Sequence, residues 1–330
     1  MIEILNLVPM DKNKEIPSFI QHQLTSFKSN LYKFSIYKFS SNQSKNILKL
    51  ENLLLIKDLI KYLKSSKAKI IHIHWGSFLG FIGTQFNFKK KTILTLRGSD
   101  LNFSNEDSLV KNYLRKYFTL AAVRNADEII CVSKELAQKI FNYNKKITII
   151  PDGTPIEIFS PIDKDVAKNK LKWNPQNYYI LFHCGNRPKH KNFDLALEVF
   201  QLVKETLANT EFIFFHNELS QADLALYFSG ADLLLFTSSA EGSPNIVREA
   251  IACGCPVVAL NVGDVQNWID ISGAGGVVAH SKELLAEKSI ETILNSKRAN
   301  SEISALYSTQ NSAKLISSLY SKLGQKYGLE

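Results

Sequence analysis

Short apolar runs alternate along the chain with segments whose apolar residues recur at helical spacing. The runs Ile2–Val8, Ile70–His74 and Lys91–Leu96 are rich in aliphatic and β-branched side chains, which is typical of buried strands. In Leu53–Lys64 the apolar residues fall on one face and the lysines on the other, which predicts an amphipathic helix. Because strands that alternate with helices form right-handed βαβ units, the pattern predicts an α/β protein with parallel sheets.

The alternation is interrupted once and then starts again. Prolines concentrate between Pro151 and Pro175, and the next strand pattern is Tyr178–Phe182. A chain of 330 residues has room for two domains. We therefore expect a linker over residues 151–173 and two Rossmann-like domains, residues 1–158 and residues 159–330. The last 30 residues have a helical pattern, and we expect this C-terminal helix to pack back on the first domain.

Composition narrows the class of protein. Hydrophobic residues make up 45% and charged residues 22%, which is ordinary for a globular protein. The chain has no run of 18 apolar residues, and its first residues lack the basic start and cleavage site of a signal peptide. The cysteines, all in apolar runs, are interpreted as buried thiols of a protein in the reducing cytoplasm: Cys131, Cys184, Cys253 and Cys255.

The net charge of +9 is unevenly distributed. Residues 1–120 hold 19 Lys and Arg against 8 Asp and Glu, a local net charge of +11. Such a basic half suits an anionic membrane surface, an anionic acceptor or nucleic acid. A lysine-rich solvated surface is the simpler alternative, and the absence of a recognised module argues against nucleic acid. We expect the lysine-faced helix at Leu53–Lys64 to favour peripheral contact with an anionic inner leaflet.

The clearest chemical signal is the segment Ala240–Ala250, which holds Glu241 and Glu249 on either side of a Gly-Ser-Pro turn. The turn precedes a helix predicted at Asn245–Ala252, so free backbone N–H groups would lie beside a carboxylate and could hold hydroxyl-rich, anionic groups. A second signal follows the strand at Tyr178–Phe182, where Gly185 is followed by Arg187, Lys189 and Lys191. A glycine turn with cations can bind a diphosphate and stabilise it as it leaves.

These segments resemble the motifs of glycosyltransferase family 4, which has the GT-B fold. Glu241 to Glu249 is similar to its E-x7-E donor signature, and the turn at Gly185 is similar to its "G-R…K" segment. Four further segments agree with family motifs in order, namely Ile71–Gly76 ("HxHW/G"), Thr95–Asp100 ("T-x-H-G-x-D"), Ala126–Ser133 ("AD-x-φ-x-x-x-S") and Pro151–Pro161 ("PNGVD…F-x-P"). The resemblance covers about residues 70–265.

The resemblance implies a retaining, metal-independent hexosyltransferase that uses a nucleotide-diphosphate sugar, a UDP-sugar or alternatively a GDP-sugar. Arg187 and Lys191 would bind the donor diphosphate, with Lys189 as the competing lysine. Glu249 would accept the ribose hydroxyls, and Glu241 would face the transferred sugar. The remaining donor contacts would come from Gly185 and from backbone amides of the turn, which Pro244 shapes, with the turn residues being Ser243, Pro244, Asn245 and Ile246.

The N-terminal half departs from the family pattern. Arg97 stands where members often carry His, and an arginine does not deprotonate, so it cannot be a base. Arg97 would contact a phosphate or the acceptor, or else the usual role is vacant. Asp100 and His74 end strands where α/β sheets place ligands, although both His72 and His74 are also typical of structural histidines. The glycine pair that many members carry after the first strand is absent.

Other motifs point to no competing site. Asp163-Lys164-Asp165 is a D-x-D string but lies in the expected linker, so we expect no metal site there. No P-loop is present, and Gly273–Gly276 is not a dinucleotide fingerprint. The sequence therefore predicts a GT-B glycosyltransferase that acts on a glycan or lipid-linked acceptor in surface-polysaccharide assembly. The alternatives are a catalytically inactive partner subunit and a GT-B sugar-nucleotide epimerase.

Overall fold

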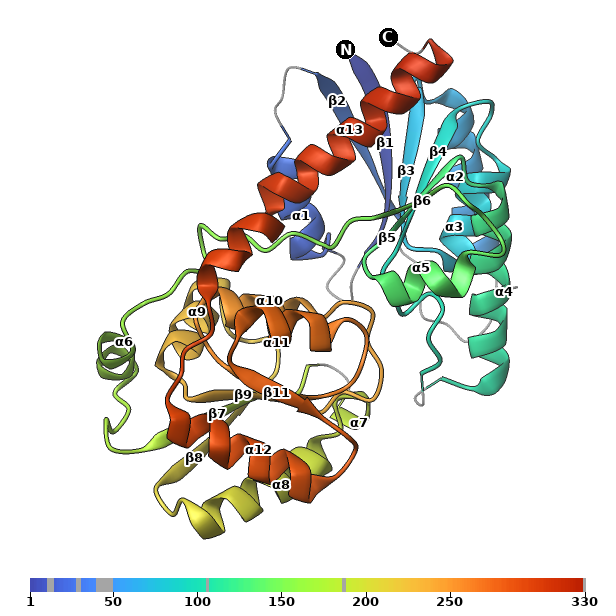
Figure 1. Cartoon of the computed structure of the whole chain (residues 1–330). Coiled ribbons are helices and arrows are strands. Elements are labelled where there is room, and N and C mark those ends of the chain that lie inside the picture. Colours follow the sequence, from blue (N-terminus) through green and yellow to red (C-terminus); the bar gives the residue numbers. More distant parts are fainter. Residues whose placement is uncertain (11–14, 28–30, 40–49, 105–106, 186–187, 329–330) are drawn as a thin grey trace. The chain divides into compact units, whose positions relative to one another are not determined.

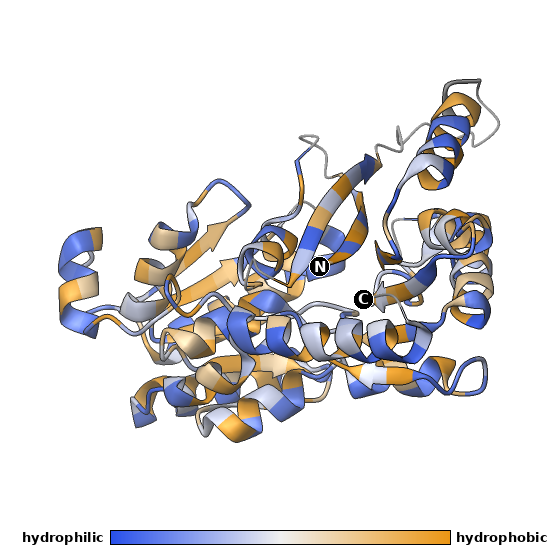
Figure 2. Ribbon diagram, turned by 90° about the horizontal axis from the view of Figure 1, so that it is seen from above, coloured by the Kyte–Doolittle hydropathy of each residue, from blue (hydrophilic) through white to orange (hydrophobic). Residues whose placement is uncertain are grey.

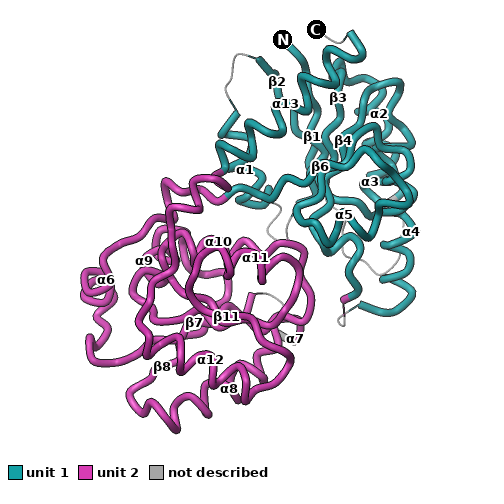
Figure 3. The backbone as a smooth tube through the Cα atoms, viewed as in Figure 1, with its two compact units in different colours: residues 1–103, 107–153, 309–330 teal, residues 104–106, 154–308 magenta. Residues whose placement is uncertain are grey.

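The computed structural model describes residues 1–10, 15–27, 31–39, 50–104, 107–185 and 188–328. It contains two compact units, each with its own parallel sheet (Figure 3). The first unit comprises residues 1–103, 107–153 and 309–330, and the second comprises residues 104–106 and 154–308. The division falls at Gly153, five residues before the boundary expected at residue 158, and the C-terminal helix is grouped with the first unit.

The first unit is built on a six-stranded sheet with the order β2-β1-β3-β4-β5-β6, in which every neighbouring pair is parallel (Figure 1). Its strands are β1 (Ile2–Pro9), β2 (Tyr32–Phe39), β3 (Ile70–His74), β4 (Lys91–Leu96), β5 (Glu128–Cys131) and β6 (Ile147–Ile149). Its helices are α1 (Ser18–Thr25), α2 (Leu50–Ser65), α3 (Ser77–Gln85), α4 (Leu109–Asn125), α5 (Lys134–Ile140) and α13 (Thr309–Tyr327).

The second unit is built on a five-stranded sheet with the order β11-β10-β9-β7-β8, again parallel throughout. Its strands are β7 (Tyr178–His183), β8 (Thr210–Phe215), β9 (Leu233–Phe236), β10 (Val257–Leu260) and β11 (Gly275–Val278). Its helices are α6 (Lys164–Leu171), α7 (Pro188–Lys191), α8 (Phe193–Thr206), α9 (Gln221–Gly230), α10 (Asn245–Ala252), α11 (Val265–Ser272), α12 (Lys282–Asn295) and the 3₁₀ helix η1 (Ser301–Tyr307).

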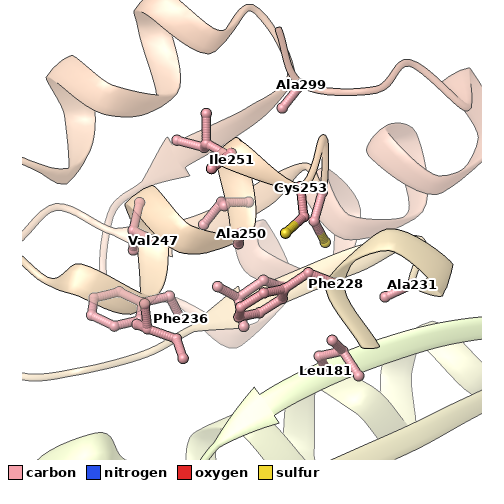
Figure 4. Packing of buried hydrophobic residues seen from close by; sticks show 14 of the residues in the cluster. Leu181, Phe228, Ala231, Phe236, Val247, Ala250, Ile251, Cys253 and Ala299 are labelled. Carbon is pink, nitrogen blue, oxygen red and sulfur yellow. The ribbon is translucent and has the colours of Figure 1, made fainter. Parts of the chain in front are cut away.

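Each sheet of the two units is covered on both faces, which is why its central strands are largely apolar (Figure 2). In the first sheet, alternate residues such as Leu5 and Ile71 face one core, while Ile4 and Ile70 face the other, which includes α13. In the second unit, α10 packs its apolar face on the sheet, with Val247 beside Phe236 (Figure 4).

Helix starts follow local capping chemistry. Ser133 caps α5 by accepting a hydrogen bond from the N–H of Leu136, and Ser108 caps α4 in the same way. Asp163 caps α6 through the N–H groups of Asp165 and Val166. The D-x-D string is thus the start of a helix, and the prediction of a linker through residue 173 was wrong because Lys164–Leu171 is helical and belongs to the second unit.

Two further expectations can be placed on the fold. The amphipathic helix predicted at Leu53–Lys64 is α2, which buries Leu59 and Leu63 and is otherwise largely exposed. All four cysteines are buried free thiols, as expected. Among the described residues, no helix is long and apolar enough to cross a membrane.

Candidate active site

The two motif loops of the second unit follow adjacent strands. The turn at Gly185 and helix α7 follow β7, and residues 237–244, hereafter the donor loop, follow β9. The chain runs from β7 to β8 on one side and returns to β9 on the other, so β7 and β9 flank the point where the strand order reverses. Open α/β sheets bind ligands in the crevice at the carboxyl ends of such strands.

Several contacts join the two loops. The N–H of Ser239 donates to the carbonyl of His190 at 3.0 Å, and the hydroxyl of Thr237 donates to the carbonyl of Lys191 at 2.8 Å. The ammonium nitrogen of Lys191 lies 2.6 Å from Oε1 of Glu241. The structure therefore brings together the lysine and the first glutamate, which are 50 residues apart in the sequence.

The Glu241 carboxylate is held in its ionised form. Burial alone would raise the pKa of Glu241, but the hydrogen bond with His190 and the positive charge of Lys191 outweigh it and lower the pKa to about 2. The His190 ring nitrogen is 3.6 Å from the same carboxylate oxygen. At neutral pH Glu241 is therefore an anion, so it can accept hydrogen bonds or stabilise positive charge but cannot act as a general acid.

The N-terminus of α10 is oriented by the donor loop. Its N-cap residue is Pro244, whose side chain makes no capping hydrogen bond. The first turn of a helix has N–H groups without intrahelical partners, and together with the helix dipole they favour an anionic or hydroxyl-rich ligand. Asn245 and Ile246 begin this helix, as the sequence predicted, and the helix bounds Asn245–Ala252 are those expected.

A buried hydrogen-bond network stabilises the donor loop. Arg248, only 3% exposed, donates to the side-chain oxygens of Ser243 and Asn245, and the Ser243 hydroxyl donates to Asp264 at 2.7 Å. The guanidinium also lies 5.3 Å from the centre of the Trp268 ring. Because the side chains of Ser243 and Asn245 are engaged in this network, their backbone amides are the groups that remain for a ligand.

Glu249 lies on α10, in the turn after these residues. Burial raises the pKa of Glu249 to about 7, and the nearby charge of Arg248 only partly offsets this effect. Within the described residues no hydrogen bond to its carboxylate is present, although the side chain keeps partial access to solvent. A partly buried acceptor of this kind suits hydroxyl groups, which would supply the missing donors.

Gly263, after β10, approaches the donor loop closely. Its φ is +58°, and a Cβ at this position would lie 2.7 Å from the carbonyl oxygen of Gly242 and 3.1 Å from that of Glu241. Only glycine combines this left-handed backbone with so close an approach. The loop after β10 therefore helps to fix the position of Glu241.

In the first unit, the loop after β3 is strained. Trp75 and Ser77 have φ values of 89° and 53°, which are uncommon for residues other than glycine. Asp100 stabilises this loop, because its two carboxylate oxygens accept from the backbone N–H groups of Gly76 and Arg97, each at 2.7 Å. Burial raises the pKa of Asp100, and these hydrogen bonds oppose the increase. Both carboxylate oxygens are therefore engaged by backbone amides of their own unit.

Arg97 is a buried cation with several partners. Its side chain is 5% exposed, and its Nε donates to both carboxylate oxygens of Asp152, at 3.0 and 3.2 Å. Its guanidinium lies 5.0 Å from the Phe19 ring centre and 5.1 Å from that of Trp75, and Nη2 is 3.4 Å from a ring nitrogen of His74. Arg97 thus stabilises the start of the connection between the two units.

The pairing of Arg97 with Asp152 joins two departures from the family motifs. Arg97 stands at the His of "T-x-H-G-x-D", and Asp152 stands at the Asn of "PNGVD". In this chain the two residues form an ion pair whose charges cancel, so neither charge is buried alone. The ion pair with Asp152 therefore explains how a buried arginine is accommodated at position 97.

The two histidines of β3 belong to the core of the first unit. His72 lies between the Tyr320 hydroxyl (2.6 Å) and the Thr95 hydroxyl (2.7 Å), and it stacks on His74 with ring centres 4.2 Å apart. Burial lowers the pKa of His72 to about 3, and burial together with His72 and Arg97 lowers that of His74 well below its usual value. Both rings are neutral at physiological pH, and His72 connects the sheet to α13.

The predicted site residues are divided between the two units, and one of them lies outside the described residues. Gly185, Lys191, Glu241, Glu249 and the residues at the start of α10 lie in the second unit, whereas Arg97 and Asp100 lie in the first. Arg187 lies outside the described residues. Of the two competing lysines, Lys191 contacts Glu241 and Lys189 is exposed.

Sequence reasoning missed four residues that shape the candidate site. His190 adjoins Lys191 and could have been singled out from that cation-rich turn. Arg248 lies inside the E-x7-E segment but was not given a role. Gly263 and Asp264 follow a strand with no recognised motif, so their contribution becomes visible only when β10 is placed beside β9.

Comparison with known proteins supports this architecture. The sequence model of glycosyltransferase family 4 matches residues 36–158, and that of the glycosyl transferases group 1 matches residues 204–295. An uncharacterized glycosyltransferase of Methanocaldococcus jannaschii is 27% identical over 255 residues, which span 71% of this chain and 68% of that protein. N-acetyl-alpha-D-glucosaminyl L-malate synthase of Bacillus anthracis is 19% identical over 351 residues, which span 94% and 85%.

Solved structures with the same fold align over nearly the whole chain. Sucrose-phosphate synthase from Thermosynechococcus elongatus has a TM-score of 0.72 at 16% identity and covers 99% of this chain and 100% of that one. The Anabaena protein HepE in complex with UDP and glucose has a TM-score of 0.71 at 14% identity and covers 98% and 100%. The two family matches together span more than half of the chain, in the order of the two units. The chain therefore has the GT-B fold and carries a glycosyltransferase family 4 domain followed by a glycosyl transferases group 1 domain.

Proposed function

We propose that the protein transfers a hexosyl group from a UDP-sugar to a glycan or lipid-linked acceptor, with retention of the anomeric configuration and without a metal ion. The observation that carries the proposal is the contact between Lys191 and Glu241, which joins the two motif loops at the strand-order reversal of the second sheet. The contact supports a site in which Lys191, the ionised Glu241 carboxylate and the N-terminus of α10 would act together.

These groups have complementary tasks. The start of α10, Lys191 and, by resemblance, Arg187 would neutralise the diphosphate as it leaves, the task that a metal ion performs in other enzymes. Glu249 would accept the two ribose hydroxyls. Glu241, ionised at neutral pH, would accept sugar hydroxyls and stabilise the positive charge that develops at the anomeric carbon.

Retention follows from attack on the same face as the departing group. The acceptor oxygen forms a bond to the anomeric carbon while the bond from that carbon to the β-phosphate oxygen breaks. The acceptor proton passes to a phosphate oxygen of the leaving UDP. Lys191 stabilises the negative charge of the diphosphate, which grows as the bond breaks.

A UDP-sugar is proposed because solved structures of similar fold are described with UDP and UDP-glucose, as in the HepE complexes, and a GDP-sugar is the alternative. Surface-polysaccharide assembly at the inner face of the cell membrane is proposed as the setting. The basic residues 1–120, with their net charge of +11, support an anionic partner for the acceptor-side unit.

The test is a transfer assay with UDP-glucose, UDP-galactose, UDP-N-acetylglucosamine and GDP-mannose against a panel of glycan and polyprenyl-phosphate acceptors. We expect one UDP-sugar to give a product whose anomeric proton coupling, measured by NMR, shows the donor configuration, with no loss of rate in EDTA. An inverted product or complete inhibition by EDTA would refute the mechanism.

One second candidate is a catalytically inactive partner subunit. It is favoured because the guanidinium of Arg97 is already paired with Asp152 and so does not take over the role that the family's His would have. Nucleotide binding without transfer to any acceptor would support that candidate. Conversion of the free UDP-sugar to its epimer would instead indicate the epimerase alternative.

A further inference from the structure

Helix α4 of the first unit has its hydrophobic face turned to the solvent. Its buried residues include two polar side chains, Asn112 and Thr119. Its exposed residues at i, i+1, i+4, i+5 and i+8 are large and apolar, with exposed fractions between 43% and 69%, and they are Leu109, Val110, Tyr113, Leu114 and Tyr117. This spacing places all five on one helix face, which we call the α4 stripe.

The cations of α4 lie beside the stripe. The helix contains Lys111, Arg115, Lys116 and Arg124 and has no Asp or Glu between its first and last residues. Lys111 and Arg115 bind Asp107 just before the helix, while Lys116 and Arg124 are exposed. The surface therefore combines an apolar stripe with a net positive charge.

Exposed aromatic rings extend the stripe at both ends. At the start of the helix, Phe103 packs edge-on against Tyr113 with ring centres 5.1 Å apart, and Lys116 lies 5.8 Å from the Phe103 ring centre. At its end, Arg124 lies 5.0 Å from the ring centre of Tyr143, which is also exposed. Aromatic rings paired with cations are suited to the boundary between lipid headgroups and acyl chains.

We propose that the α4 stripe docks the first unit on an anionic lipid bilayer, with α4 lying in the plane of the interface. The 17 residues of α4 give the helix a length of about 25 Å, enough for the stripe to lie along the surface. The apolar side chains enter the headgroup boundary, while Lys116 and Arg124 meet lipid phosphates. The proposed contact rests on the proposed function and extends it by naming a membrane partner for the first unit.

Charge favours a bilayer over a second copy of the chain. A two-fold symmetric contact through the stripe would place the same patch on both sides, so the cations of each copy would approach one another. An anionic bilayer offers the opposite charge. We therefore assign the expected membrane contact to α4 instead of α2, because α4 exposes five large apolar side chains and the described part of α2 exposes three.

The experiment is flotation of the full chain with liposomes of phosphatidylcholine alone or with 30% phosphatidylglycerol, at 50 and 300 mM salt and without nucleotide. The test variant is Val110→Glu with Tyr117→Glu, two stripe positions with little contact to the core. The matched control is Leu284→Glu with Leu294→Glu, two exposed leucines of α12 with the same change of charge. Thermal unfolding and size-exclusion chromatography with light scattering are recorded for each protein.

We expect the wild type and the α12 control to float with the anionic liposomes, more weakly at 300 mM salt, and the stripe variant to bind at least about tenfold less with an unchanged midpoint of unfolding. Equal binding of the stripe variant, or no binding of the wild type, would overturn the proposal. A wild-type dimer that the stripe variant converts to a monomer, without liposome binding, would assign the stripe to self-association instead. UDP binding by the same variant tests the donor site separately, so either inference can fail alone.

Discussion

The buried pair Arg97–Asp152 gives a quantitative test of how this chain accommodates its departures from the family motifs. Both side chains are nearly inaccessible, with exposed fractions of 5% and 11%, and Nε is 3.0 Å from the nearer carboxylate oxygen. Replacing Arg97 by Met leaves Asp152 as an uncompensated buried charge, which costs about 3–5 kcal/mol. Asp152→Asn, which leaves the arginine uncompensated, should cost a similar or smaller amount.

The double variant Arg97→His with Asp152→Asn places a neutral pair at these two positions. Its free energy of unfolding should therefore be closer to that of the wild type than either single variant, with a coupling energy of about 2 kcal/mol or more. A loss of 3 kcal/mol lowers the urea midpoint by about 1 M or more, which is easily resolved.

The assay is urea unfolding followed by the fluorescence of Trp75, which contacts Arg97, in a Trp173→Phe, Trp268→Phe background. These three are the tryptophans of the chain, so the signal then reports on the first unit alone. The control is Arg124→Met, which removes an exposed cation stacked on Tyr143 and should cost less than about 1 kcal/mol.

Additive single effects, or costs below 1 kcal/mol for both Arg97→Met and Asp152→Asn, would refute the reasoning. Activity then separates positioning from catalysis. If Arg97 acts through its neighbours, the double variant retains kcat. If its guanidinium contacts the substrate, kcat falls in the double variant even though stability is restored.

Three further predictions concern the second unit. Burial raises the pKa of Glu249 to about 7 from a usual value of 4.5, so its ionisation destabilises the folded state as the pH rises above 4.5. Glu249→Gln should therefore increase the free energy of unfolding by about 3 kcal/mol at pH 8, and this gain should be nearly absent at pH 4.5. A stability difference that is the same at both pH values would contradict this. Gly263→Ala should weaken UDP-glucose binding measured by calorimetry by about tenfold, because its Cβ would press on the donor loop. Gly273→Ala has a similar positive φ but only a flexible lysine nearby, so it should leave binding unchanged, and equal effects would refute the contact. Lys191→Ala should remove about 2–4 kcal/mol of transition-state stabilisation, measured as a fall in kcat/KM, whereas replacing the exposed Lys189 by Ala should change kcat/KM by less than about twofold. The reverse ranking would identify Lys189 as the lysine that binds the diphosphate.

The sequence predicted the elements whose patterns are local. The strands Ile70–His74 and Lys91–Leu96 and the helix Asn245–Ala252 have the predicted bounds, because β-branched runs and a proline-led helix start are read directly from neighbouring residues. The proximity of the Lys191 turn to the donor loop also follows from the rule that ligands bind at the carboxyl ends of parallel strands.

Other elements carry no such local signal. Helix α3 was missed because its residues Ser77–Gln85 include two glycines and few polar residues, so no helical face stands out. The four-residue strand β11 begins with two glycines that themselves resemble a turn. Each is positioned by packing against neighbours, which outweighs intrinsic propensity.

The remaining site features depend on contacts between distant parts of the sequence. Arg97 and Asp152 are 55 residues apart, and His72 and Tyr320 are 248 apart, so neither pairing is visible in any local window. The reversed amphipathicity of α4 is likewise hidden, because the sequence shows the period of the apolar residues but not which face meets the core.

The central claim, that the two loops after β7 and β9 bind a nucleotide sugar, is tested most directly by thermal unfolding with UDP, GDP, ADP and CMP. The proteins are the wild type, Glu249→Ala and the control Glu205→Ala, which removes an exposed carboxylate of α8. A ligand at about 100 times its Kd adds about 2.7 kcal/mol of stability. We predict that UDP stabilises the wild type and Glu205→Ala but not Glu249→Ala, and stabilisation by none of the nucleotides, or equal stabilisation of all three proteins, would contradict the account.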